Sequence, residues 1–151
     1  MQTVALSLLI LALPAALLLA RAPDPEPSPD LGPEEVIRLQ VDALRTGADG
    51  IATAFRFASP SNRAATGPLP RFEAMIRGGY ADLLTAERAE YGDLRVRGEE
   101  AAQRVTLIQP DGARSAYVFG LSRQRGGACN GCWMTDAVMP VEPPESETFR
   151  I

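Results

Sequence analysis

Cys129 and Cys132 are the two cysteines of the chain, and Asn130-Gly131 separates them. A thiolate in such a Cys-x-x-Cys pair exchanges disulfides when its neighbours lower its pKa. Asn-Gly between two predicted strands instead favours a two-residue hairpin turn, whose flanking residues have Cα atoms about 5.5 Å apart, inside the disulfide range. We therefore expect a structural disulfide. Zinc is not expected, because a structural site needs four ligands.

Asp136 is the first candidate for acid–base chemistry. It alternates with Met134 and Val138, so these three side chains are expected on one face of a strand. If that face points inward, the carboxylate must be paired or have a raised pKa, which is the property of a general base. If it points outward, the carboxylate is simply hydrated. Tyr117, in the preceding predicted strand, is the second candidate.

Asn62 and Arg63 are the candidate ligand-binding residues. They lie at the centre of residues 55–72, a segment dense in residues that start and end helices. In one interpretation they lie at the mouth of a pocket, where arginine grips a carboxylate or phosphate with two hydrogen bonds. In the other, Asn62 bonds backbone groups of an irregular loop and Arg63 pairs with a nearby acid.

The composition excludes several kinds of site. All 15 basic residues are arginine, histidine is absent, and the net charge is −4. The basic footprint of a nucleic-acid-binding protein is missing, so no nucleic acid is expected as a partner. Without histidine, the commonest metal ligand and the usual general base are both missing. We therefore predict no metal and no cofactor.

The N-terminus predicts export. Residues 4–20 are an uninterrupted apolar run followed by a small-residue motif, which is typical of a secretory signal, and 17 residues are about the minimum that spans a bilayer as a helix. Residues 1–22 are therefore either a signal peptide or a membrane anchor, and the protein is periplasmic or tethered facing the periplasm. Residues 23–32 alternate proline with acidic residues, which predicts an extended linker.

The helices that must position these residues come first in the chain. Pro33 followed by two glutamates predicts a helix start, because proline suits the first helical position and carboxylates stabilise the positive end of the dipole. We expect three helices, the first from Pro33 to Gly47, the second from Asp49 to Ala58 and the third from Pro70 to Gly79.

The strands follow. From Glu87 the apolar period changes from about four to two, which predicts strands at 88–97, 100–109, 114–124 and 132–141. In the third of these, Tyr117, Phe119 and Leu121 share the face that should pack on the helices. The order predicts an α+β domain over residues 33–141, with three helices on one side of a curved, antiparallel, four-stranded sheet, and residues 142–151 as a flexible tail.

The segment 55–72, with its Ser-Pro-x-Asn-Arg and Thr-Gly-Pro elements, resembles the domain of unknown function 4864 family, as do Tyr80, Leu83-Leu84 and residues 132–136. That family is similar to the nuclear transport factor 2-like, or cystatin-like, cone superfold. The resemblance implies helices packed in the concavity of a bent sheet and a pocket between them. It implies no activity, because one superfold carries many functions.

Three hypotheses for function follow. The favoured one is a non-catalytic, exported or membrane-tethered module that binds a small molecule or a partner protein; some members of the superfold dimerise, so a homodimer is a further expectation. The second is a cofactor-free isomerase, cyclase or hydrolase that uses Asp136 and Tyr117. The third is a periplasmic thiol–disulfide protein built on Cys129 and Cys132.

Overall fold

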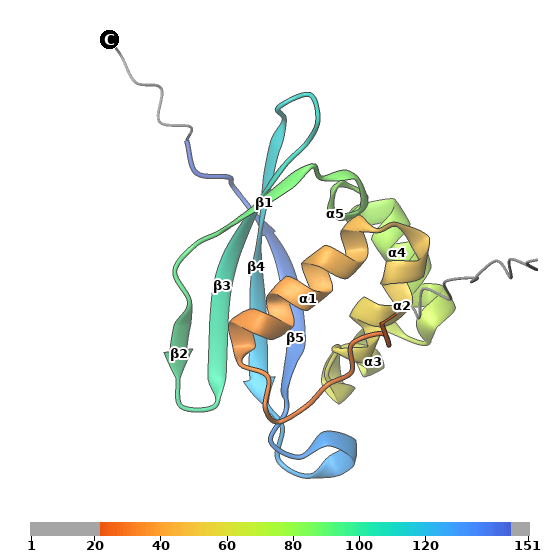
Figure 1. The fold of residues 1–151 in the computed structure, drawn as a ribbon, viewed down its shortest axis with the longest axis vertical. Helices are drawn as coiled ribbons and strands as arrows, with labels where there is room; N and C mark the ends of the chain where they lie inside the picture. The colour runs from red at the N-terminus through yellow and green to blue at the C-terminus, as the bar shows by residue number, and fades with distance from the viewer. Residues whose placement is uncertain (1–21, 146–151) are drawn as a thin grey trace, which may run out of the picture.

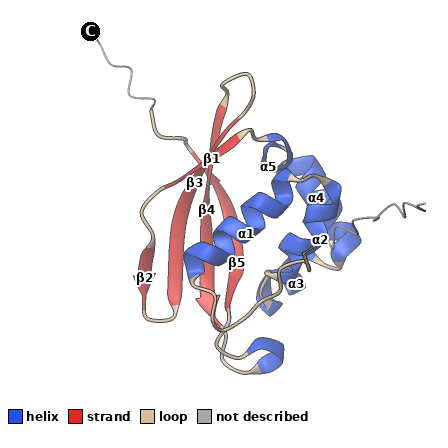
Figure 2. Cartoon of the chain, in the orientation of Figure 1, coloured by secondary structure: helices blue, strands red, loops and turns tan. Residues whose placement is uncertain are grey.

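The computed structural model describes residues 22–145 (Figure 1). The predicted signal or anchor at 4–20 lies outside this range. Within it, no helix is long and apolar enough to cross a membrane. Helices form the first part of the domain and strands the second. Figure 2 shows the helices gathered beside the sheet, so the expected α+β architecture is confirmed. The helices are α1 (Pro33–Arg45), α2 (Ala48–Arg56), α3 (Pro60–Thr66), α4 (Leu69–Gly79) and α5 (Asp82–Thr85).

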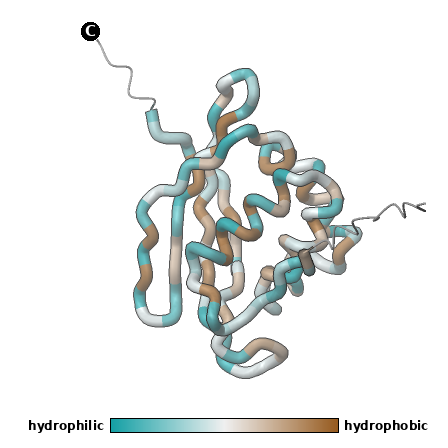
Figure 3. The backbone as a smooth tube through the Cα atoms, in the orientation of Figure 1, coloured by the Kyte–Doolittle hydropathy of each residue, from teal (hydrophilic) through white to brown (hydrophobic). Residues whose placement is uncertain are grey.

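Helix α1 begins where the sequence predicts. Pro33 is its first residue, and the Glu35 side chain accepts a 2.7 Å hydrogen bond from the Gly32 amide, which satisfies one free donor at the helix start. Apolar and polar residues alternate along the helix with the period of one turn (Figure 3). The buried face consists of Val36, Ile37, Gln40, Val41 and Leu44.

The sheet is antiparallel, with the order β1-β3-β4-β5, and β2 also pairs with β3. Its strands are β1 (Arg88–Tyr91), β2 (Arg95–Arg97), β3 (Glu100–Ile108), β4 (Arg114–Arg123) and β5 (Trp133–Val141). Tyr117, Phe119 and Leu121 belong to the core shared with the helices, as expected from their alternation. Helix α1 lies across this face of the sheet (Figure 1).

The predicted numbers of helices and strands were too low. Helices α3 and α5 are separate, with only seven and four residues, which is too short for a periodic apolar face to be visible in the sequence. The single strand predicted at 88–97 is divided into β1 and β2. Gly92 and Asp93, which disfavour strand structure, lie at the break. Five helices therefore pack on a five-stranded sheet in the described residues.

The segment between α2 and α3 runs beside strand β5. Residues 57–59 form a parallel bridge in which the Thr135 amide donates to the Phe57 carbonyl at 2.8 Å and the Ser59 amide donates to the Thr135 carbonyl at 2.9 Å. Phe57, Ala58 and Ser59 are all buried. This bridge brings the start of α3 to the middle of the domain.

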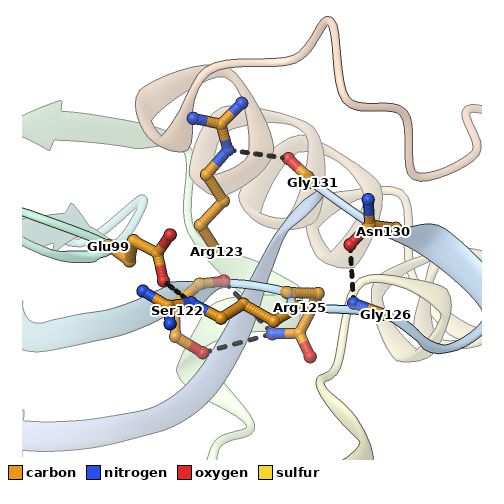
Figure 4. A network of polar contacts seen from close by, with 8 residues as sticks. Glu99, Ser122, Arg123, Arg125, Gly126, Asn130 and Gly131 are labelled. Carbon is orange, nitrogen blue, oxygen red and sulfur yellow. Dashed lines mark hydrogen bonds and ion pairs between the residues drawn. The ribbon is translucent and has the colours of Figure 1, made fainter.

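The connection from β4 to β5 is not the predicted two-residue hairpin. It spans residues 124–132 and contains a 3-10 turn (Gly127–Cys129). Gly126 and Gly127 both adopt positive φ, and the Asn130 side chain accepts from the Gly126 amide at 2.6 Å (Figure 4). Asn130 and Gly131 are the central residues of a β-turn in which the Cys132 amide donates to the Cys129 carbonyl at 3.3 Å, but Cys129 belongs to the 3-10 turn, so this β-turn does not join two strands directly. Arg123 also donates to the Gly131 carbonyl at 3.2 Å, which fixes the end of the loop.

Candidate functional site

A partly open cavity of about 240 Å³ lies between the helices and the sheet. Its wall is mostly apolar, with helices α1 to α5 on one side and strands β4 and β5 on the other. The apolar wall includes Leu44, Phe72, Ile76, Leu83, Phe119 and Val138, and the polar members include Gln40, Asn62, Thr135 and Asp136. The space between the helices and the sheet is therefore not completely filled, and Asp136 lies in the wall of this cavity.

Asp136 lies at a β-bulge, and it lines both this cavity and a more open groove that Arg95 and Arg97 also line. In the β4–β5 ladder Thr135 lies opposite Leu121 and Ala137 opposite Gly120, so Asp136 is an extra residue without a partner on β4. The extra residue reverses the alternation after it. The prediction that Asp136, Met134 and Val138 share one face is therefore wrong. Val138 lies opposite the core residue Phe119 and packs on the core, whereas Met134 lies on the other face of the sheet.

A short chain of hydroxyls reaches the Asp136 carboxylate from helix α3. Ser61 Oγ donates to Asp136 Oδ1 at 3.4 Å, and the hydroxyls of Ser59 and Ser61 are 2.9 Å apart. At 3.4 Å the bond to Asp136 is long, so it uses little of the hydrogen-bonding capacity of the carboxylate. The half-buried carboxylate keeps most of this capacity for a group inside the cavity.

Asn62 lines the cavity and also holds α3 against the sheet. Its side-chain Nδ2 donates to the Thr135 carbonyl at 3.0 Å. Its backbone amide donates to the Ser59 hydroxyl at 3.2 Å, so Ser59 caps the helix. The two predicted site residues Asn62 and Asp136 thus lie on one cavity wall, joined by the segment around Thr135.

Gln40 and Thr135 form a buried polar pair in the cavity wall that the sequence did not single out. Thr135 Oγ1 donates to Gln40 Oε1 at 2.5 Å, and Gln40 Nε2 donates to the Ala54 carbonyl at 3.0 Å. Gln40 is 5% exposed and Thr135 is 1% exposed. The sequence did contain one signal for this pair, because Gln40 lies within the apolar face of α1 and a buried amide requires hydrogen-bond partners.

Comparison with known proteins identifies the family. A family model described as Domain of unknown function (DUF4864) matches residues 30–148. The chain belongs to the DUF4864 family. No curated protein matches the sequence. A crystal structure described as a calcium/calmodulin dependent protein kinase II association domain from Xanthomonas campestris is similar, with a TM-score of 0.43 and 13% sequence identity; the match covers 83% of this chain and 100% of that chain.

Tyr117 of this DUF4864 domain lies outside the cavity wall. Its hydroxyl donates to Asp82 Oδ1 at 2.5 Å, and its ring packs on Tyr80 with centroids 5.6 Å apart. Tyr80, by contrast, lines the cavity. The structure thus separates the two predicted acid–base candidates, with Asp136 in the cavity and Tyr117 bonded to the start of α5. Burial and the bond to Asp82 raise the pKa of the Tyr117 hydroxyl above its ordinary value near 10.

We expect Tyr117 to make stability depend on pH above 10. Because the pKa of Tyr117 is higher in the folded state, its contribution to the free energy of unfolding is complete below pH 10. The contribution declines above pH 10, where the unfolded chain loses this proton first. Tyr117→Phe should lower the free energy of unfolding at pH 8 by about 1–2 kcal/mol, because Asp82 loses its donor. It should also reduce the decline above pH 10. Urea unfolding at several pH values measures both effects.

The wild type measured at each pH is the control for this experiment, because Tyr80, which packs on Tyr117, also raises the pKa of Tyr117, and Tyr80→Phe would change the same decline. Tyr91 also has a raised pKa, mainly from burial, so part of the decline should remain in every variant. Equal declines in the wild type and Tyr117→Phe would contradict the assignment.

Arg63 points away from the cavity of Asp136. Its Nε donates to the Ala58 carbonyl at 3.1 Å, and its Nη2 donates to the carbonyls of Phe55 and Arg56 at 3.0 and 2.9 Å. The guanidinium also lies 4.7 Å from the centre of the Phe55 ring. Arg63 therefore caps the C-terminal end of α2. Among the described residues no carboxylate pairs with it.

Cys129 and Cys132 form a disulfide, with Cα atoms 5.6 Å apart. In the chain-entropy model, a disulfide that closes so short a loop stabilises the fold by about 2 kcal/mol. Other contacts also hold the loop, including the 2.8 Å bond from the Gln124 amide to the Cys132 carbonyl. In residues 22–145, no group of three or more Cys, Asp or Glu side chains is placed to hold a metal ion.

Proposed function

We propose that the DUF4864 domain binds a small, mainly apolar molecule that carries an amine or another hydrogen-bond donor. The observation that carries this proposal is the partly open, mostly apolar cavity with the Asp136 carboxylate in its wall. Apolar cavities of roughly 150 Å³ admit benzene. A volume of about 240 Å³ suits a single ring with a substituent.

The polar groups of the cavity support a ligand with a donor. Asp136 is an acceptor with one long hydrogen bond, from Ser61. Gln40 and Asn62 already donate to backbone carbonyls, so Asp136 is the strongest acceptor that faces the cavity with spare capacity. A protonated amine would make a charge-assisted hydrogen bond to it, which is stronger than a neutral one.

Binding without catalysis is the form of the proposal that the residues favour. An acid–base mechanism built on Asp136 and Tyr117 requires both groups at one substrate, and the Tyr117 hydroxyl is committed to Asp82 outside the cavity wall. The apolar run at 4–20 supports a role for the module outside the cytoplasm, either secreted or tethered.

Three related probes test the proposal: benzylamine, toluene and benzoate, titrated into the full chain and followed by calorimetry. We expect benzylamine to bind best and benzoate worst, because the carboxylates of benzoate and Asp136 repel each other. Asp136→Asn should weaken benzylamine binding about tenfold, as expected for loss of a charged hydrogen-bond partner, and change toluene binding less than about twofold.

Ala65→Trp provides the matched test of location. Ala65 lies on an exposed position of α3 and lines the cavity, so a large side chain there should block it without disturbing the core. All probes should bind this variant more weakly. The proposal fails if Ala65→Trp binds benzylamine like the wild type, or if Asp136→Asn weakens toluene and benzylamine equally.

A further inference from the structure

The linker that precedes the domain forms ion pairs with one of its arginines. Arg56, at the end of α2, contacts Asp24 Oδ2 and Glu26 Oε1, each at 3.3 Å. The two acids are two residues apart, and both of their carboxylates reach the same guanidinium. An acidic, proline-rich, extended peptide is therefore already seated on this surface, and it supplies two carboxylates to one guanidinium.

A groove of about 570 Å³ lies beside the linker. One side is formed by Glu26 and Pro27, and the other by residues 126–129 of the disulfide loop. Arg56 and Arg63 both line it. This groove is separate from the cavity of Asp136, which is lined by neither arginine.

Each of the two arginines has one terminal nitrogen without a hydrogen bond to the residues that the structure describes. Arg56 Nη1 is buried and makes no hydrogen bond of good geometry, although Glu26 lies 3.3 Å away. Arg63 Nη1 is bonded to no group in the part of the chain that the structure describes, while its Nε and Nη2 are fixed by carbonyls. Two positive side chains, one of them rigidly held, therefore face an open groove.

The contacts of the linker are weak enough to exchange. The side chains of Asp24 and Glu26 are 52% and 67% exposed. Ion pairs at such exposure contribute little to stability, and salt screens them. An incoming peptide with carboxylates can therefore compete for Arg56, and the linker competes through its high effective concentration.

We propose that this groove binds an extended acidic peptide of a partner protein, with carboxylates spaced as in Asp-x-Glu, and that Asp24 and Glu26 form a tethered competitor for the same arginine. Charge complementarity and the seated linker both support a peptide of this kind. Proline in the ligand helps, because a polyproline II segment loses little conformational entropy on binding. The proposal is independent of the cavity and its ligand.

A fluorescent peptide with the sequence of residues 23–30 is the probe, titrated into the full chain and followed by anisotropy. The Asp24→Asn/Glu26→Gln variant should bind it about tenfold more tightly than the wild type, since the internal competitor is removed. Raising the salt concentration should weaken binding. Arg56→Gln introduced into this variant should remove most of the gain.

Two controls isolate the groove from general charge effects. Arg77→Gln, which removes an exposed arginine paired with Glu73 on α4, should leave peptide affinity unchanged. A peptide with Asn and Gln in place of its acids should not bind. The proposal is overturned if the neutral peptide binds equally well, if Asp24→Asn/Glu26→Gln does not increase affinity, or if Arg56→Gln and Arg77→Gln have equal effects. Thermal unfolding confirms that each variant is folded.

Discussion

Gly50→Ala is expected to lower the free energy of unfolding by about 3 kcal/mol, although it adds only one methyl group. Gly50 lies in α2 where this helix meets the end of α1. A Cβ at this position would overlap the Ala43 carbonyl group and lie 2.7 Å from Thr46 Oγ1. The overlapping atoms belong to the backbone, so the two helices must separate to relieve the clash.

Chemical denaturation of wild type and variant measures this loss, with Gly78→Ala as the matched control. Gly78 lies in α4, and a Cβ there has no neighbour within 4 Å. The control should be neutral or stabilising by up to about 1 kcal/mol, because alanine is the better helix former. A Gly50→Ala variant as stable as Gly78→Ala would show that the helices do not meet as closely as described.

Gln40→Ala is the second substitution with a large expected effect, about 3 kcal/mol. It removes buried volume and leaves the buried Thr135 hydroxyl without its partner, while the Ala54 carbonyl keeps only the Phe57 amide as a donor. Thr135→Val keeps the volume and should cost about 1–2 kcal/mol, since only one hydrogen bond is lost.

A double-mutant cycle tests whether the two residues act together. Because Gln40→Ala already removes the partner of the Thr135 hydroxyl, the double variant should cost less than the sum of the single variants, by about 1 kcal/mol. Additive losses in urea unfolding would mean that the hydrogen bond between these side chains does not contribute.

The regular elements of the fold could be predicted from the sequence because each shows its pattern locally. Helix α1 has an apolar face, a proline at its start and acids in its first turn, and β4 alternates from Tyr117 to Leu121. Helices α3 and α5 were missed because a helix of four to seven residues has too few turns to show a period.

The site could be predicted only in part, because its geometry depends on contacts between distant residues. Asp136 and Asn62 were both found as candidates, but the bridge from Ala58 to Thr135 that brings them together links the beginning and the end of the domain. The bulge at Asp136 results from the register in which β5 pairs with β4, and the sequence around Asp136 does not predict that register. The Tyr117 hydroxyl donates a hydrogen bond to Asp82, a residue 35 positions earlier in the chain, and this contact could not be predicted from the sequence near Tyr117.

The segment at 57–59 has a consequence for solubility. Strand β5 ends the main sheet, and an open strand edge is a template on which other chains can add strands and aggregate. The Thr135 amide and carbonyl, in β5, are occupied by residues 57 and 59, so this position offers no backbone group to a second molecule. At the opposite edge, β1 and β2 have only four and three residues and carry Arg88, Arg95 and Arg97. Short strands with exposed charge resist such growth, so this margin, and the position of Thr135 on β5, limit aggregation by strand addition.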